Sequence, residues 1–150
     1  METSVWNFLF AEDALEKRES TIEFFRELEQ RKYEAFISDV VIREVGRIEE
    51  TERSNLLLLL NKYNPAVLPS SEEVASFAEK LVTQDVIPER FRDDALHISY
   101  AVVNELDILA SWNMRHIVKL RTKVMVNALA EMEGFKRIII CTPEEVIGYG

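Results

Sequence analysis

The stretch of residues 92–113 constrains the fold more than any other part of the chain. It reads RDDALHISYAVVNELDILASWN, and apolar residues recur in its first half at the spacing of one helix face. Asp93 and Asp94 lie in the first turn of this predicted helix, where carboxylates interact favourably with the helix dipole. The apolar run 108–110 then predicts a buried strand that ends before Ser111 and Asn113. A helix that leads directly into a buried strand is typical of a parallel α/β sheet.

The other segments repeat this alternation of helices and short apolar strands. Further strands are expected at residues 35–37, 66–68 and 137–141, and residues 3–5 could form the stub of a first strand. Helices are expected after residue 38 and over residues 16–30, 50–63, 71–84, 114–120 and 121–133. The pattern predicts one three-layer α/β domain over residues 1–150, in which helices cover both faces of a parallel sheet.

Three short motifs predict where helices begin and end. Ser70, with Glu73 three residues later, resembles a capping box. The sequence TPEE at residues 142–145 combines an N-cap threonine, proline at the first helical position and a glutamate at the third. Gly134 is expected to end the helix before it, because glycine readily adopts the left-handed conformation of a C-terminal cap.

The net charge of −9 argues against a protein that binds nucleic acid through its whole surface, because such binding relies on lysine and arginine. The charge is unevenly distributed, since residues 108–130 contain no acidic side chain. This basic segment is either an edge that faces RNA or a solvated helix face. Its basic side chains are Arg115, His116, Lys119, Arg121 and Lys123.

Cysteine content and hydropathy indicate the compartment. The single cysteine, Cys141, has no partner for a disulfide within the chain and is expected to be a small buried side chain. The longest apolar run, residues 56–60, is far shorter than the roughly 20 residues of a membrane span. No signal-peptide pattern opens the sequence, so a cytoplasmic protein is expected. Neighbouring elements or a second subunit are expected to cover the run 56–60.

Five polar side chains are candidates to meet at one edge of the predicted sheet. Glu2 and Asn113 lie at the carboxyl ends of strands, Glu44 lies on the helix after the second strand, and Asp93 and Asp94 open the central helix. Carboxyl ends of parallel strands share an edge, and ligands bind there. Gathered carboxylates repel one another unless a cation neutralises them, and oxygen ligands select Mg²⁺ or Mn²⁺. Such an ion can activate water for attack on a phosphodiester.

An alternative interpretation of these acids remains open. The chain has 27 acidic residues in 150, so carboxylates on solvated faces and at helix starts are common by chance. Residue spacing alone does not separate a convergent metal site from such charges.

Together these segments resemble those of PIN-domain proteins, specifically the toxin ribonucleases of VapBC toxin–antitoxin pairs. The resemblance covers nearly the full length and rests on the opening ETS, VVIREV around Glu44, DALHISYA, ILASWNMRHI and the closing IIICTPEEV. It implies a central parallel sheet of about five strands flanked by helices. It also implies an endoribonuclease that depends on Mg²⁺ or Mn²⁺, a homodimer, and a cognate antitoxin protein that inserts a segment to block the site.

The resemblance assigns roles to individual residues. Glu2, Glu44 and Asp94 match the three acids that bind the metal, and Asn113 holds the place of a fourth catalytic acid. The family usually has aspartate where Glu2 and Asn113 stand, so one ligand is longer and one negative charge is lost. Ser4 matches a hydroxyl that orients this corner. The family places its first strand centrally, so a chain that begins at residue 1 has a shortened central strand, and an upstream start codon is an alternative.

Several neighbours of these acids have two possible roles. Asp93 and Ser111 are expected to hold the metal-binding residues in position without binding the metal themselves, although Asp93 could instead be a helix N-cap. His97 could transfer a proton or contact phosphate, but at its spacing on a mostly buried helix a packed, hydrogen-bonded histidine is the simpler expectation. Arg43 and Arg47 flank Glu44 and are either substrate contacts or its ion-pair partners.

The basic residues after Asn113 are the candidate contacts to RNA phosphate. Arg115, His116 and Lys119, together with Ser4, are assigned to substrate binding, and capping of a short helix is the alternative for Arg115 and His116. Two functions from different classes follow: a metal-dependent endoribonuclease, or a catalytically silent PIN-fold module that binds a partner protein or RNA. The retained Glu44 and Asp94 favour the first, whereas the Glu2 and Asn113 replacements and the acidic surface favour the second.

Overall fold

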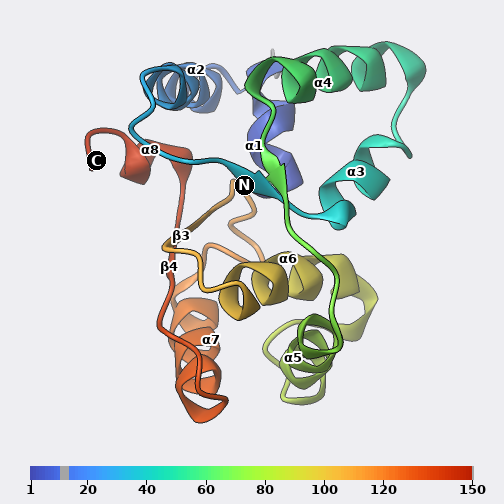
Figure 1. The fold of residues 1–150 in the computed structure, drawn as a ribbon, viewed down its shortest axis with the longest axis vertical. Coiled ribbons are helices and arrows are strands. Elements are labelled where there is room, and N and C mark those ends of the chain that lie inside the picture. The colour runs from blue at the N-terminus through green and yellow to red at the C-terminus, as the bar shows by residue number, and fades with distance from the viewer. Residues whose placement is uncertain (11–13, 150) are drawn as a thin grey trace.

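A computed structural model describes residues 1–10 and 14–149 (Figure 1). The α-helices of this part are α1 (Thr3–Asn7), α2 (Leu15–Glu29), α3 (Asp39–Val45), α4 (Glu50–Tyr63), α5 (Glu72–Thr83), α6 (Arg92–Val103), α7 (Leu120–Met132) and α8 (Pro143–Val146). Two 3₁₀ turns, η1 (Phe8–Phe10) and η2 (Glu89–Phe91), precede α2 and α6. The strands are β1 (Phe36–Ile37), β2 (Ala66–Val67), β3 (Ile108–Ala110) and β4 (Ile139–Cys141).

The strands form two separate parallel pairs. Strand β1 pairs with β2, and β3 pairs with β4. The first two residues lie between the pairs, because the Met1 α-amine donates to the Phe36 carbonyl at 2.8 Å and the Glu2 N–H donates to the Ala110 carbonyl at 3.1 Å. The fold is therefore α/β with parallel strands as predicted, but in the described residues it has two short two-stranded sheets rather than one continuous sheet of about five strands.

Residues 3–5 form the start of α1 and not the stub of a strand. The cause is local: the Glu2 carboxylate accepts a hydrogen bond from the Ser4 N–H at 3.1 Å and so acts as the N-cap of α1. A cap of this kind satisfies one of the orphan donors of the first helical turn. Extended backbone consequently ends at Glu2, the second of the two residues that bridge β1 and β3.

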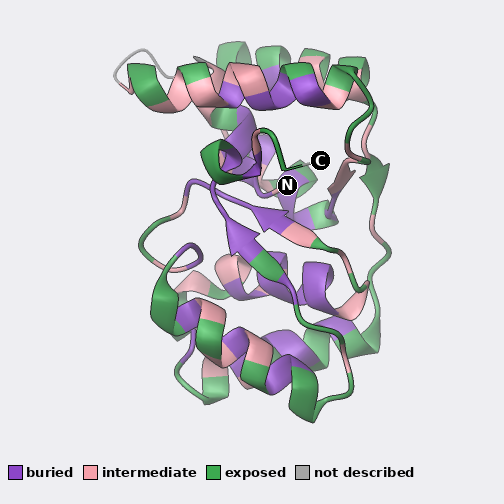
Figure 2. Cartoon of the chain, turned by 90° about the vertical axis from the view of Figure 1, so that its left-hand side faces the viewer, coloured by how far each residue is buried: buried purple, intermediate pink, exposed green. Residues whose placement is uncertain are grey.

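The core has two main apolar clusters, one on each face of the β3–β4 pair. Successive strand side chains point to opposite faces. Leu109 and Ile140 pack with α5, α6 and α7, whereas Ala110 and Cys141 pack with α1, α2, α3 and α4. In Figure 1, α2 and α4 lie at one end of the molecule and α5 and α7 at the other, and Figure 2 shows the buried strands between them. Helices thus cover both faces of this parallel pair, as the sequence predicts.

Local signals predict some boundaries well and others poorly. The TPEE motif forms a capping box, in which the Thr142 hydroxyl accepts from the Glu145 N–H and the Glu145 carboxylate accepts from the Thr142 N–H. Helix α5 is capped by Ser71, which accepts from the Val74 N–H at 3.2 Å, so the expected cap at Ser70 is wrong by one residue. Residues 114–119 form turns instead of the expected short helix.

Helix α4 leaves part of its apolar run uncovered. Leu56 is only 1% exposed, but Leu57 and Leu58 are 46% and 68% exposed. Neighbouring elements of this chain therefore cover one face of the run and not the other. Among the described residues, no helix is both long and apolar enough to cross a membrane.

Candidate functional site

The candidate site lies at the carboxyl ends of β1 and β3. Glu2 precedes α1, Glu44 is in the last turn of α3, and His97 lies one turn into α6. One ligand atom from each of these three side chains lies within 4.8 Å of the others. The three residues come from segments far apart in the sequence, so their meeting is a product of the tertiary fold. We call them the acidic centre.

His97 links the two carboxylates of the acidic centre. Its Nε2 lies 2.5 Å from Glu44 Oε1 and 3.9 Å from Glu2 Oε1, and the imidazole is only 4% exposed. Glu44 Oε1 also accepts a hydrogen bond from the Thr3 hydroxyl at 2.9 Å. Burial acts to raise the pKa of Glu44, but the hydrogen bond and charge of His97, aided by Thr3 and Arg43, outweigh it and lower the pKa below its usual value. Glu44 is therefore a carboxylate at neutral pH.

Glu2 is held by hydroxyl groups from two directions. It is 6% exposed, and its Oε2 accepts from the Ser4 hydroxyl at 2.5 Å and the Ser111 hydroxyl at 2.6 Å. The same hydroxyl oxygens accept backbone N–H groups: Ser4 Oγ from Trp112 at 2.8 Å, and Ser111 Oγ from Asn113 at 2.9 Å. This network ties the segment after β3 to the start of α1 and fixes the position of the Glu2 carboxylate. Ser111 thus holds the Glu2 carboxylate in position through a hydrogen bond, which is the supporting role expected for it from the sequence.

Asp94 forms a second acid–histidine pair beside the acidic centre. His116 Nδ1 lies 2.8 Å from Asp94 Oδ2. Burial raises the pKa of Asp94 and the negative charge of Glu2 raises it further, against hydrogen bonds from His116 and Asn113 that lower it. Because the charge of Glu2 acts on Asp94, the two carboxylates lie close enough to interact. Asp94 is nevertheless outside the group of three whose ligand atoms lie within 4.8 Å of one another, and its role as a metal ligand stays a prediction.

Asn113 organises the loop that follows β3. Its side-chain oxygen accepts the His116 N–H at 2.9 Å, and its backbone carbonyl accepts from Val118 at 2.8 Å. These contacts satisfy the backbone of the turn at residues 114–119. The amide oxygen that could assist a metal is thus engaged with the backbone, while the residue holds His116 in reach of Asp94.

The arginines around Glu44 pair with Asp93 instead. Arg43 Nη2 lies 2.7 Å and Arg47 Nη1 3.5 Å from the Asp93 carboxylate. Asp93 is not the N-cap of α6, since that position is held by Phe91. The ion pairs connect α3 to α6, the two helices that carry Glu44 and His97, so Asp93 supports the acidic centre through helix positioning.

The expected RNA contacts lie at the rim of the site. Arg115 and Lys119 are exposed, and neither has a carboxylate within ion-pair distance among the residues that the structure describes. His116 is half-buried and engaged with Asp94. Trp6 and Trp112 are buried in the core, and the Trp112 indole donates to the Thr21 hydroxyl at 2.9 Å.

His97 is the member of the acidic centre that the sequence left undecided. It is buried and hydrogen-bonded, in line with the simpler expectation, but its partner is the Glu44 carboxylate. The sequence did contain one sign of this role. His97 follows Asp94 by three residues, so both side chains lie on the same side of a helix that begins at the carboxyl edge of the strands.

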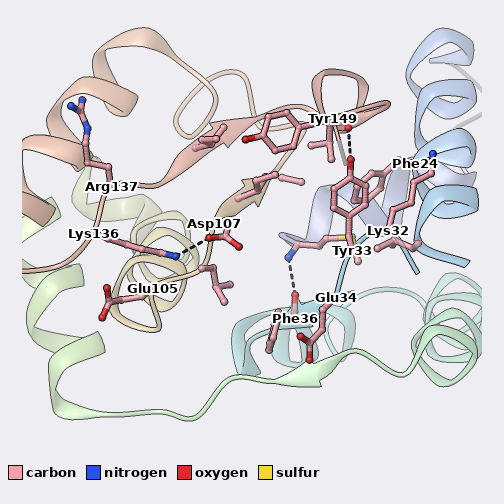
Figure 3. Close-up of a pocket in the computed structure, with 18 residues that line it drawn as sticks. Phe24, Lys32, Tyr33, Glu34, Phe36, Glu105, Asp107, Lys136, Arg137 and Tyr149 are labelled. Atoms are coloured by element: carbon pink, nitrogen blue, oxygen red, sulfur yellow. Dashed lines mark hydrogen bonds and ion pairs between the residues drawn. The ribbon is translucent and has the colours of Figure 1, made fainter. Parts of the chain in front are cut away.

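A large cavity lies at the opposite edge of the strands, away from the acidic centre. Its volume is about 790 Å³, and its lining includes Met1, Phe36, Ile108 and Ile139 (Figure 3). The dashed line to Phe36 in Figure 3 marks the hydrogen bond from the Met1 α-amine. Lys136 and Asp107, also in view, form an ion pair at 2.8 Å. Size alone would make this cavity the first candidate site, but the titratable groups that could carry chemistry together lie at the other edge.

Comparisons with known proteins found no relative of this chain. No protein-family model, curated protein or solved structure matches the chain. The likeness to PIN-domain proteins therefore stays an expectation from sequence motifs, and the function has to be argued from the site.

Proposed function

We propose that this chain is a divalent-cation-dependent endoribonuclease with a PIN-like fold. The observation that carries the proposal is the acidic centre: Glu2, Glu44 and His97, from three distant segments, bring ligand atoms within 4.8 Å of one another. Two buried or half-buried carboxylates at such distance repel unless a positive charge lies between them. Their position at the carboxyl edge of parallel strands is where α/β proteins bind ligands.

The arrangement of the strands supports the PIN-like fold. Reading across the molecule, the order is β2, β1, residues 1–2, β3 and β4. This is the order expected of a five-stranded parallel sheet whose first strand is central and shortened to two residues. The proposed fold thus differs from the two observed strand pairs only in the length of its middle strand.

The donor atoms fit a divalent cation, with a preference that differs from the one expected. Carboxylates suit Mg²⁺ and Mn²⁺, whereas imidazole is a better ligand for transition metals. A centre of two carboxylates and one imidazole should therefore favour Mn²⁺ over Mg²⁺. If His97 keeps its hydrogen bond to Glu44, it orients that ligand instead of binding the ion itself.

Each residue of the site has a proposed role in hydrolysis. Glu2 and Glu44, with Asp94 beside them, would hold the cation, and the hydroxyls of Ser4 and Ser111 fix Glu2 in place. A bound cation supplies activation of water and neutralises charge on the phosphate. The Asp94–His116 pair would be available to hold a proton for the leaving oxygen.

Arg115 and Lys119 would contact the RNA phosphates from the rim. Asn113 would assist by holding the loop that carries both side chains. A cognate antitoxin and a homodimer belong to the same proposal, and the exposed Leu57 and Leu58 of α4 are available to a second subunit.

A second function has its own support. Glu2 Oε2 already accepts two hydroxyl donors, and Glu44 is already paired with His97. A centre whose acceptors are satisfied by protein donors can be a structural network. On that basis the alternative is a catalytically silent PIN-fold module that binds a partner protein or RNA.

Metal titration with matched variants separates the two functions. Mn²⁺ and Mg²⁺ are titrated calorimetrically into the wild type, Glu44→Gln and Asp94→Asn, with cleavage of single-stranded RNA assayed on the same samples. Glu52→Gln is the control, because Glu52 is an exposed carboxylate on α4. We expect the wild type and the control to bind Mn²⁺ and cut RNA, and Glu44→Gln to do neither. A wild type that binds no metal at millimolar concentration and leaves RNA intact would replace the nuclease by the silent module.

A further inference from the structure

Two arginine side chains gather on one aromatic ring next to the candidate site. The guanidinium carbons of Arg90 and Arg115 lie 4.9 Å and 5.8 Å from the centroid of the Phe91 ring. The imidazole of His116 also contacts this ring, with 4.1 Å between the centroids. Since His116 is hydrogen-bonded to Asp94, Phe91 and His116 connect the arginine pair to the Asp94 carboxylate.

The Phe91 ring is a fixed support for these cations. Phe91 is half-buried and packs against the apolar cluster formed by α5, α6 and α7. It ends the 3₁₀ turn Glu89–Phe91 and is the N-cap of α6, the helix that carries Asp94 and His97. An arginine that stacks on an aromatic face loses part of its mobility before a ligand arrives, which lowers the entropic cost of binding.

In the part of the chain that the structure describes, the two charges have no internal counterion. Within the described residues, neither Arg90 nor Arg115 lies within ion-pair distance of a carboxylate, although the chain carries a net charge of −9. By contrast, the neighbouring Arg92 pairs with Glu79 at 2.5 Å. Two like charges near the same ring repel each other, and a bound anion close to both would offset that repulsion. The planar guanidinium is also the side chain best suited to a phosphate.

We propose that Arg90, Phe91 and Arg115 form a subsite for the phosphate backbone of single-stranded RNA, beside the acidic centre. We call it the arginine subsite. It rests on the proposed function for the identity of its ligand, because the Phe91 ring contacts His116, which pairs with Asp94 at the candidate site. Guanidinium planes and aromatic rings also stack with unpaired bases, which favours a single strand over a duplex.

The test is RNA binding measured without cleavage. A fluorescent single-stranded oligoribonucleotide is titrated with protein in EDTA, and anisotropy gives Kd over a series of salt concentrations. Arg90→Ala and Arg115→Ala should each weaken binding roughly tenfold, the loss expected for one charge-assisted contact. Each should also lower the slope of log K against log salt by about 0.7, the value for one phosphate contact in a single strand.

Two further variants make the result specific. Arg121→Ala is the matched control, because Arg121 is an exposed arginine of the same basic segment whose side chain donates to the Asp85 carbonyl. It should leave Kd and the salt slope unchanged. Phe91→Leu should weaken RNA binding without any change in charge. Phe91→Tyr should bind RNA as the wild type does, since tyrosine keeps the aromatic face.

The outcomes separate the subsite from the nuclease. If the wild type binds RNA and both arginine variants lose affinity, the subsite stands, even if no metal ion supports cleavage. If the wild type cuts RNA but the arginine variants bind as the wild type does, the subsite is wrong and the nuclease is not. Equal losses in Arg121→Ala would mean diffuse attraction to the basic segment, and a wild type that binds no RNA would equally overturn the subsite.

Discussion

The buried α-amine of Met1 should make the stability of the fold depend on pH. This amine donates to the Phe36 carbonyl at 2.8 Å, and burial lowers its pKa from 8.0 to about 6, against the opposing charge of Glu2. Between these two values the unfolded chain holds a proton that the folded chain does not. The free energy of unfolding therefore rises with pH across this window. At about 1.4 kcal/mol for each pKa unit, the gain from pH 6 to pH 8 is roughly 3 kcal/mol.

The assay is urea unfolding followed by circular dichroism at intervals from pH 5.5 to 8.5, on protein whose free Met1 amine is verified by mass spectrometry. The control has to remove the charge of the amine alone. An extension joined to Met1 turns the amine into an uncharged amide. The difference in unfolding free energy between the extended protein and the protein with a free Met1 amine should shrink towards pH 8. Parallel curves for both would refute the reasoning.

The composition of the extension tests a second property of this edge. Strand β3 uses alternate residues to pair with β4, so the backbone of Ile108 faces the cavity of about 790 Å³ that Met1 and Phe36 also line. An extension of Val-Ile-Val can hydrogen-bond to this backbone, at about 1 kcal/mol for each bond. Gly-Pro-Gly is the matched control, because proline has no N–H to donate. Equal melting temperatures for the two extensions would show that the cavity does not accept a strand.

Three substitutions test buried polar contacts elsewhere in the fold by urea unfolding. Asn127→Ala should cost about 2–3 kcal/mol, because the amide side chain bonds both the N–H and the carbonyl of Ile138 beside β4. Thr21→Val should cost about 1–3 kcal/mol, since it keeps the side-chain shape and leaves the Trp112 indole N–H without its acceptor. Thr142→Ala should cost about 1 kcal/mol through loss of the capping box of α8.

Each of these has an outcome that would contradict it. The control for Asn127→Ala is Asn61→Ala on α4, because Asn61 is exposed. Asn61→Ala should change the free energy of unfolding by less than about 0.5 kcal/mol. If both variants lost the same stability, the loss in Asn127→Ala could not be assigned to its hydrogen bonds. For Thr21→Val, an unchanged stability would mean that the Trp112 indole finds another acceptor. For Thr142→Ser, which retains the hydroxyl, stability should stay near that of the wild type.

The elements of this fold that could be predicted are those whose bounds depend on residues close together in the sequence. The strand Ile108–Ala110 and the helix Glu50–Tyr63 have the bounds that the sequence predicts. Both depend on periodicity and on residues at their own ends. Residues 3–5 could not be assigned in this way, because their apolar pattern fits a short strand, and the Glu2 side chain decides for a helix by capping it.

The meeting of Glu2 and Glu44 could be expected from the sequence, but the histidine partners of the acids could not. The rule that ligands bind at the carboxyl edge of parallel strands led to this edge, where Glu2 and Glu44 lie together with His97. Which histidine meets which acid depends on how α3 and α6 pack, and no local pattern encodes that. The ion pairs of Asp93 with Arg43 and Arg47 belong to the same packing, so these arginines could not be assigned to Asp93 from the sequence.

Two arrangements can compensate the carboxylates that meet at this edge. A divalent cation between them is one. A hydrogen-bond donor from the protein is the other, and His97 is placed for it, because its Nε2 lies 2.5 Å from Glu44 Oε1 and 3.9 Å from Glu2 Oε1. A sequence lists the acids but not the group that comes to lie between them. Metal binding to this centre must therefore displace or recruit His97, and the variant His97→Ala separates these cases: tighter Mn²⁺ binding means displacement, and weaker binding means that His97 is a ligand or orients one.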